Sequence, residues 1–154
     1  MISLLIVAEQ PAMRKGLNMR LTAEADFAVV GETGDCETAL ALAIAHCPDV
    51  VLVDADMAFT DGIAIAKILH SMCPKTSIVI LSIRDDVFTC KRAEEAGAKA
   101  IVVKSLPTDT LLTTIRRVVG SVDFPVATQI DEEKSLAATN KEEVNSNRDM
   151  REIS

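Results

Sequence analysis

The chain has 154 residues, which is enough for one ordinary domain and a short tail. Hydrophobic residues make up 49% of the chain and aromatic residues only 3%, so we expect a core of aliphatic side chains. The formal net charge of −7 argues against a surface for nucleic acid or anionic membranes, because phosphate groups are bound by clustered Lys and Arg. No apolar stretch approaches the roughly eighteen residues that a membrane span requires.

The N-terminal apolar run is short and has no basic flank, so we expect no signal peptide and a cytoplasmic protein. The cysteines show no CxxC spacing and no metal-type spacing with the histidines. Reduced and mostly buried thiols are therefore expected at Cys36, Cys47, Cys73 and Cys90.

Short apolar runs recur along the chain, and most of them are continuous instead of alternating with polar residues. This pattern is typical of strands that are buried on both faces of a parallel sheet. The predicted strands lie at residues 2–7, 27–30, 50–53, 77–81 and 100–103.

The segments between these strands carry apolar residues three and four positions apart, which predicts helices with one apolar stripe each. Alternating strands and helices predict an α/β fold with a five-stranded parallel sheet and helices on both faces. Right-handed crossovers favour the flavodoxin-like strand order 2-1-3-4-5. In that order the ligand site lies beyond the carboxyl ends of the first and third strands.

We expect residues 1–121 to form this single domain. Residues 122–154 contain scattered apolar residues among many charged ones, with acidic residues in excess. Such a composition is typical of a flexible linker or tail.

Polar side chains follow four of the predicted strands at their carboxyl ends. Glu9 comes after the first strand, Asp54 and Asp56 after the third, Ser82 after the fourth and Lys104 after the fifth. These strand ends meet at one edge of a parallel sheet, so we expect the side chains to lie close together. Neighbouring carboxylates repel one another and attract a hard divalent cation, which predicts bound Mg²⁺.

This set of side chains suits the transfer of a phosphoryl group to a carboxylate. Asp54 is expected to attack the phosphorus, while Mg²⁺ held by Glu9 and Asp54 neutralises the phosphoryl oxygens. Lys104 and the Ser82 hydroxyl would contact the remaining oxygens. The added negative charge would draw both inward and shift the last strands and helices, which predicts a switch and not an enzyme with its own substrate.

Five segments, taken in chain order, resemble the landmarks of a bacterial two-component response-regulator receiver domain. The resemblance is strongest to the NarL/FixJ-like subfamily. The resemblance covers residues 2–120 and implies the CheY-like (βα)5 fold. The segments are 5–17 (LIVAEQPAMRKGL), 29–32 (VVGE), 48–57 (PDVVLVDADM) with Asp61 and Gly62 following, 80–82 (ILS) and 102–105 (VVKS).

The resemblance implies that Asp54 is the phosphate acceptor, Ser82 the switch hydroxyl and Lys104 the paired lysine. It implies a metal site made by Glu9, Asp54 and the backbone carbonyl of Asp56. The phosphoryl donor would be a histidine kinase, the output regulation of transcription, and the last strand and helix a homodimer surface. Members of the subfamily usually continue into a DNA-binding domain. We therefore expect that output domain only in a longer chain, and no direct DNA binding by these residues.

Three positions depart from the family pattern. Ala8 stands where the family usually has the first of two adjacent acids, which predicts weaker metal binding. Ile101 stands where an aromatic switch residue is common, which argues against a rotating aromatic readout. Ala58 replaces the usual proline of the acceptor loop.

Two other functions remain open at this point. The departures fit a degenerate receiver that binds partners without being phosphorylated. The pair of Asp54 and Asp56 also resembles the first motif of haloacid-dehalogenase-type phosphatases, in which the second Asp is a general acid. That motif belongs on the first strand, however, and no acid pair closely follows Lys104.

Overall fold

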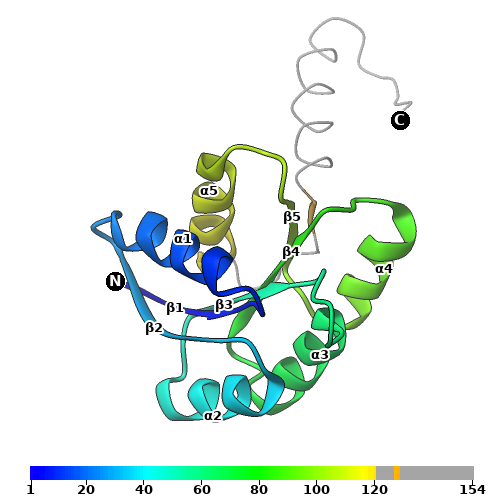
Figure 1. The fold of residues 1–154 in the computed structure, drawn as a ribbon, viewed down its shortest axis with the longest axis horizontal. Coiled ribbons are helices and arrows are strands. Elements are labelled where there is room, and N and C mark those ends of the chain that lie inside the picture. The colour runs from blue at the N-terminus through cyan, green and yellow to red at the C-terminus, as the bar shows by residue number, and fades with distance from the viewer. Residues whose placement is uncertain (121–126, 129–154) are drawn as a thin grey trace, which may run out of the picture.

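The computed structural model describes residues 1–120 and 127–128. Strands and helices alternate along the chain, as the apolar pattern predicted (Figure 1). In chain order they are β1 (Ile2–Val7), α1 (Pro11–Thr22), β2 (Phe27–Thr33), α2 (Cys36–His46), β3 (Val50–Asp54), α3 (Gly62–Met72), β4 (Ser77–Ser82), α4 (Val87–Glu95), β5 (Ala100–Val103), α5 (Thr108–Val119) and β6 (Ala127–Thr128).

All strands are parallel in one sheet, with the order β2-β1-β3-β4-β5-β6. The predicted order 2-1-3-4-5 is thereby confirmed. The structure adds β6, whose Ala127 and Thr128 pair with Ala100 and Ile101 at the edge of the sheet. A two-residue strand is too short to leave an apolar pattern, so the sequence did not indicate it. Of the predicted tail, residues 122–126 and 129–154 lie outside the described residues, and the boundary of the tail stays a prediction.

The strands are buried because helices cover both faces of the sheet (Figure 1). Alternate residues of β1, β3, β4 and β5 enter two separate hydrophobic clusters. Leu5 and Val7 of β1 belong to the cluster with α2, α3 and α4, whereas Leu4 and Ile6 belong to the cluster with α1 and α5. Each such side chain stabilises the fold by about 1.5–3 kcal/mol when it is buried. Burial on both faces explains why the apolar runs are continuous.

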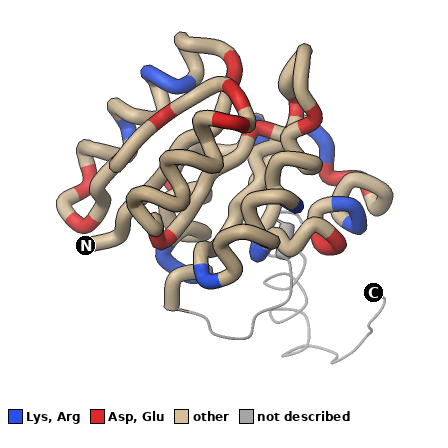
Figure 2. Tube along the Cα trace, turned by 90° about the horizontal axis from the view of Figure 1, so that it is seen from below, with Lys and Arg blue, Asp and Glu red and all other residues tan. Residues whose placement is uncertain are grey.

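Charged residues are spread over many elements of the domain, and basic residues are interspersed with acidic ones (Figure 2). In this view the described residues form no continuous basic face of the kind that binds nucleic acid. Within residues 1–120 and 127–128, none of the helices has the length and hydropathy of a membrane span.

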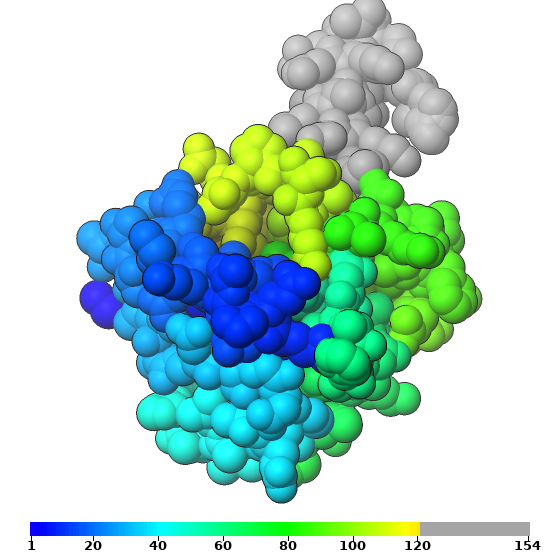
Figure 3. Space-filling model, viewed as in Figure 1, coloured from blue at the N-terminus to red at the C-terminus, as the bar shows by residue number. Residues whose placement is uncertain are grey.

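A cavity of about 290 Å³ lies between α1 and α5, which adjoin in the space-filling view of Figure 3. Met13 and Leu17 of α1 and Leu111 of α5 contribute its apolar lining. Lys104, the residue after β5, also lines it. This mostly apolar cavity therefore extends to one of the predicted site residues.

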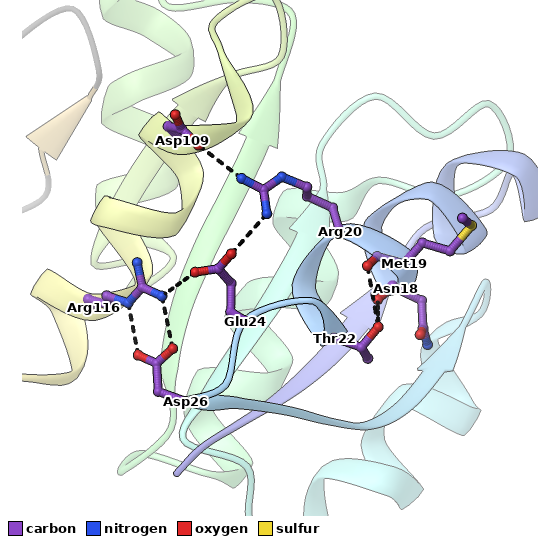
Figure 4. A network of polar contacts seen from close by, with 8 residues as sticks. All are labelled: Asn18, Met19, Arg20, Thr22, Glu24, Asp26, Asp109 and Arg116. Carbon is purple, nitrogen blue, oxygen red and sulfur yellow. Dashed lines mark hydrogen bonds and ion pairs between the residues drawn. The ribbon is translucent and has the colours of Figure 1, made fainter.

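An exposed group of charges, here named the α1–α5 ion cluster, joins α1, the loop after it and α5 (Figure 4). Arg20 contacts Glu24 at 3.0 Å and Asp109 at 2.9 Å. Arg116 contacts Glu24 at 2.7 Å and Asp26 at 2.8 Å. Hydrogen bonds from Arg116 hold the pKa values of Glu24 and Asp26 below their usual range. These contacts fasten α5 to the start of β2.

Candidate functional site

Asp54 is the last residue of β3, and it is only 4% exposed. Its position is set by β4, because Asp54 pairs with Leu81 and the Ala55 N–H donates to the Leu81 carbonyl at 2.8 Å. Gly62 packs so closely behind it that a Cβ at that position would lie 2.0 Å from the Asp54 carbonyl oxygen. The fold thus presents one nearly buried carboxylate at the carboxyl edge of the sheet.

Lys104 brings a cation to the same edge. Its backbone N–H donates to the Ser82 carbonyl at 2.8 Å, which extends the pairing of β4 and β5 by one residue. Its Nζ lies 2.5 Å from Asp54 Oδ1 and 3.2 Å from Asp56 Oδ2. The Asp54 side chain is 6% exposed and that of Lys104 24%. A buried carboxylate requires such a partner, because an unpaired charge is costly to remove from water.

The side chain of Asp56 connects two loops, a role that the sequence analysis missed. Its backbone N–H donates to Asp54 Oδ1 at 2.9 Å, while its own Oδ2 accepts the N–H of Ile83 at 2.7 Å. The loop after β3 is thereby joined to the loop after β4. From the sequence, Asp56 was expected to contribute its backbone carbonyl to a metal site, or its carboxylate as the general acid of a phosphatase. The signal for this role in the sequence was the presence of an acid two residues after the acceptor, at the sheet edge where the loop after β4 also begins.

Ser82 is the last residue of β4 and is 1% exposed. Its Oγ accepts the backbone N–H of Arg84 at 3.0 Å. The structure therefore brings Ser82, Asp54 and Lys104 to one edge of the sheet. Ser82 thus comes directly before the β4–α4 loop, and its hydroxyl supports that loop through Arg84.

Glu9 follows β1 and reaches across to the loop after β3. Its two carboxylate oxygens accept the backbone N–H groups of Ala58 and Phe59 at 2.7 and 3.0 Å. Arg14 holds the turn from behind, since its Nη1 donates to the carbonyls of Ala8 and Glu9 at 2.7 and 2.9 Å. Glu9 is thus at the predicted place, but both of its oxygens support a loop.

The departures from the family pattern have clear structural counterparts. Ala8 is fully buried, so a methyl group fills the position of the missing acid. Ile101 is fully buried in the core that α3 and α4 share with the sheet. Among the described residues, no group of three or more His, Cys, Asp and Glu side chains is arranged to hold a metal ion.

Comparison with known proteins identifies the family. The model of the response regulator receiver domain matches residues 4–116. The transcriptional regulatory protein YxjL of Bacillus subtilis is 35% identical over 115 residues, which cover 75% of this chain and 53% of that protein. The oxygen regulatory protein NreC of Staphylococcus aureus is 30% identical over 150 residues, which cover 96% of this chain and 66% of that protein. The chain spans about half the length of the first curated relatives it matches.

Solved structures agree with this result. The signal receiver domain of the response regulator NarL from Mycobacterium tuberculosis has a TM-score of 0.72 and 26% identity, covering 79% of this chain and 98% of that one. A LuxR-family response regulator from Aurantimonas has a TM-score of 0.77 over 90% of this chain and 98% of that one, and at 21% identity it supports the fold alone. The predicted resemblance is therefore confirmed: the chain belongs to the response regulator receiver domain family, with relatives among transcriptional regulators of the NarL and LuxR type.

Proposed function

We propose that Asp54 accepts a phosphoryl group from a phosphohistidine of a histidine kinase and that Ser82 and Lys104 respond to it. The observation that carries this proposal is the nearly buried Asp54 carboxylate with the Lys104 ammonium 2.5 Å away at the carboxyl edge of the sheet. The ammonium lies where it can neutralise charge that develops on a phosphoryl group bound to Asp54.

In the transfer step, a carboxylate oxygen of Asp54 forms a bond to phosphorus while the phosphorus–nitrogen bond of the phosphohistidine breaks. The imidazole leaves with the electron pair of that bond and takes up a proton. Lys104 contributes charge neutralisation and positioning but loses no proton, and the product is an aspartyl phosphate.

Mg²⁺ is proposed as the cofactor of this step, and the donor set fits it. Mg²⁺ is usually held by one or two carboxylates together with phosphate oxygens and waters, and not by a full protein cage. Asp54 would supply a carboxylate and Asp56 its backbone carbonyl. Glu9 would have to release at least one of its bonds to Ala58 and Phe59 before it could serve as a ligand. When bound, the ion neutralises negative charge on the phosphoryl oxygens.

The signal would leave through the elements that follow Ser82 and Lys104. A phosphoryl group that draws both side chains toward Asp54 pulls on the loops before α4 and α5, which are the partner-facing elements that we propose. By analogy with the relatives, the output is transcription regulation through a DNA-binding domain in a longer chain, with a homodimer through β5 and α5 and a cytoplasmic location. We assign the chain no substrate turnover of its own.

One experiment tests the proposal directly. The protein is mixed with Mg²⁺ and acetyl phosphate or phosphoramidate, and its intact mass is measured beside that of Asp54→Ala. We expect a gain of about 80 Da in the unchanged protein and none in the variant. A gain that persists in Asp54→Ala would overturn the assignment of the acceptor.

A second candidate is favoured by the buried Ala8 methyl and by the engaged Glu9 carboxylate, namely a receiver that binds its partner without phosphate. It predicts no mass gain in the same experiment. Ala8→Asp then identifies the cause, because labelling restored by that single carboxylate would trace the loss to metal binding. Steady hydrolysis of a phosphomonoester would instead indicate a phosphatase.

A further inference from the structure

We propose that the Asp56 carboxylate stands in for the phosphoryl group in the unphosphorylated protein and must be displaced when Asp54 is phosphorylated. The inference rests on the proposed function of Asp54 and adds a regulatory contact within the same site. In this role Asp56 is a positioning residue, because it acts on the acceptor through Lys104 and through the loop after β4.

The geometry places an anionic oxygen where a phosphoryl oxygen would need to be. Asp56 Oδ2 accepts the Ile83 N–H at 2.7 Å and lies 3.2 Å from Lys104 Nζ. The same Nζ lies 2.5 Å from Asp54 Oδ1. One ammonium and one backbone N–H thus converge on a carboxylate oxygen beside the acceptor. These are donors that a phosphoryl group on Asp54 would require.

The contact also holds the loop between β4 and α4. Ile83 is tied to Asp56, and the next residue, Arg84, donates its N–H to Ser82 Oγ at 3.0 Å. Three apolar side chains of this loop and of the start of α4 are open to solvent, with Ile83 65%, Val87 84% and Phe88 70% exposed. The first two residues of this loop are held by Asp56 and by Ser82. The loop will therefore change its position when a phosphoryl oxygen replaces either partner.

Phosphorylation therefore involves an exchange of partners. The Ile83 N–H and the Lys104 ammonium pass from Asp56 to the phosphoryl oxygens, and the Asp56 carboxylate, which is 25% exposed, turns toward solvent. Until it does so, Asp56 competes for both donors and repels the incoming anion. Asp56 should consequently slow the phosphorylation of Asp54 and hold the β4–α4 loop in its inactive position.

The test compares Asp56→Asn with a control, Asp86→Asn, which removes a charge from the β4–α4 loop that Asp56 contacts. The Asp86 carboxylate bonds the Thr89 hydroxyl at 2.6 Å. Labelling rates with acetyl phosphate and Mg²⁺ are followed by intact mass. Before the donor is added, hydrogen exchange of the Ile83 amide is measured by NMR. We expect Asp56→Asn to be labelled about fivefold faster and its Ile83 amide to exchange several times faster, while Asp86→Asn changes neither property.

The outcomes separate this inference from the function on which it rests. Labelling of the unchanged protein with no acceleration in Asp56→Asn overturns the inference and leaves the function intact. Labelling of Asp56→Asn alone supports the inference and shows that the unchanged protein is held in its inactive state. Failure of both proteins to take up phosphate, with both folded, overturns the proposed function together with the inference. Equal acceleration in Asp86→Asn would reduce the effect to simple charge repulsion and also overturn the stand-in role.

Discussion

Two groups of charged side chains in this domain have similar distances between opposite charges but differ in how much of them is exposed to water. At the acceptor edge, Lys104 lies within 3.2 Å of both Asp54 and Asp56, and the Asp54 side chain is 6% exposed. In the α1–α5 ion cluster, Arg116 lies 2.8 Å from Asp26, but these side chains are 40% and 48% exposed (Figure 4). Geometry alone would rank the two groups as equals.

Burial and charge balance separate them. At the acceptor edge two carboxylates share one ammonium in a mostly buried place, so any change of partner is felt strongly. In the α1–α5 ion cluster water screens each pair and can replace a lost partner. We therefore expect the first group to control function and stability, and the second to fasten α5 with little individual effect.

The largest effect is expected from Lys104→Met. Removal of the shared ammonium leaves two neighbouring carboxylates uncompensated, which should lower the free energy of unfolding by about 3 kcal/mol. Loss of a charge-stabilising donor should also slow labelling of Asp54 by about 100-fold. Urea unfolding and intact mass measure the two effects. Lys91→Met, which changes an exposed lysine of α4, should alter neither, and a stable, rapidly labelled Lys104→Met would contradict our view of the acceptor edge.

A second substitution disturbs the backbone of the acceptor residue. Gly62→Ala places a Cβ 2.0 Å from the Asp54 carbonyl oxygen, so the backbone must shift. We expect a loss of about 2 kcal/mol in unfolding free energy and slower labelling, because the acceptor moves away from Lys104.

Gly16→Ala is the matched control, since a Cβ at that position of α1 meets nothing within 4 Å. It should increase stability by about 0.5–1 kcal/mol through the higher helix propensity of Ala. Equal losses in both variants would show that the tight contact at Gly62 has no special importance.

The sequence predicted the position of the acceptor edge but not its internal bonds. Continuous apolar runs indicated strands buried on both faces, and topology then brought Asp54, Ser82 and Lys104 together. The bond from Ala58 to Glu9 joins residues 49 positions apart, and its partner choice depends on the path of a loop. The contact of Asp56 with Ile83 likewise depends on two loops, neither of which has a repeating pattern. Side-chain partners of this kind are decided by tertiary structure.

A third prediction concerns pH and the α1–α5 ion cluster. Arg116 lowers the pKa values of Glu24 and Asp26 from their ordinary 4.5 and 3.8, so their contribution to stability is present above those values. It is lost as the pH falls through the lowered values. Arg116→Gln should therefore lower the unfolding temperature by roughly a few degrees near pH 7, and the difference should shrink in acid.

Thermal unfolding between neutral and acidic pH measures this difference, with Lys15→Gln of α1 as the control that keeps the cluster. High salt should reduce the effect of Arg116→Gln because the pairs are exposed. Part of the loss should persist at high salt, since the guanidinium also lies 4.7 Å from the centre of the Phe27 ring. A difference that grows as the pH falls would mean that Arg116 does not stabilise the charged carboxylates.

The smallest effect is expected from Asp109→Asn, at the outer end of the same cluster. Asp109 contacts Arg20 at 2.9 Å, which is shorter than the 3.2 Å between Lys104 and Asp56, yet its side chain is 86% exposed. Ordering two long side chains offsets the weak attraction between charges in water, so the unfolding temperature should not change measurably. Arg20 also keeps Glu24 as a partner at 3.0 Å. A loss as large as that of Lys104→Met would show that distance, and not burial, governs the energy of these contacts.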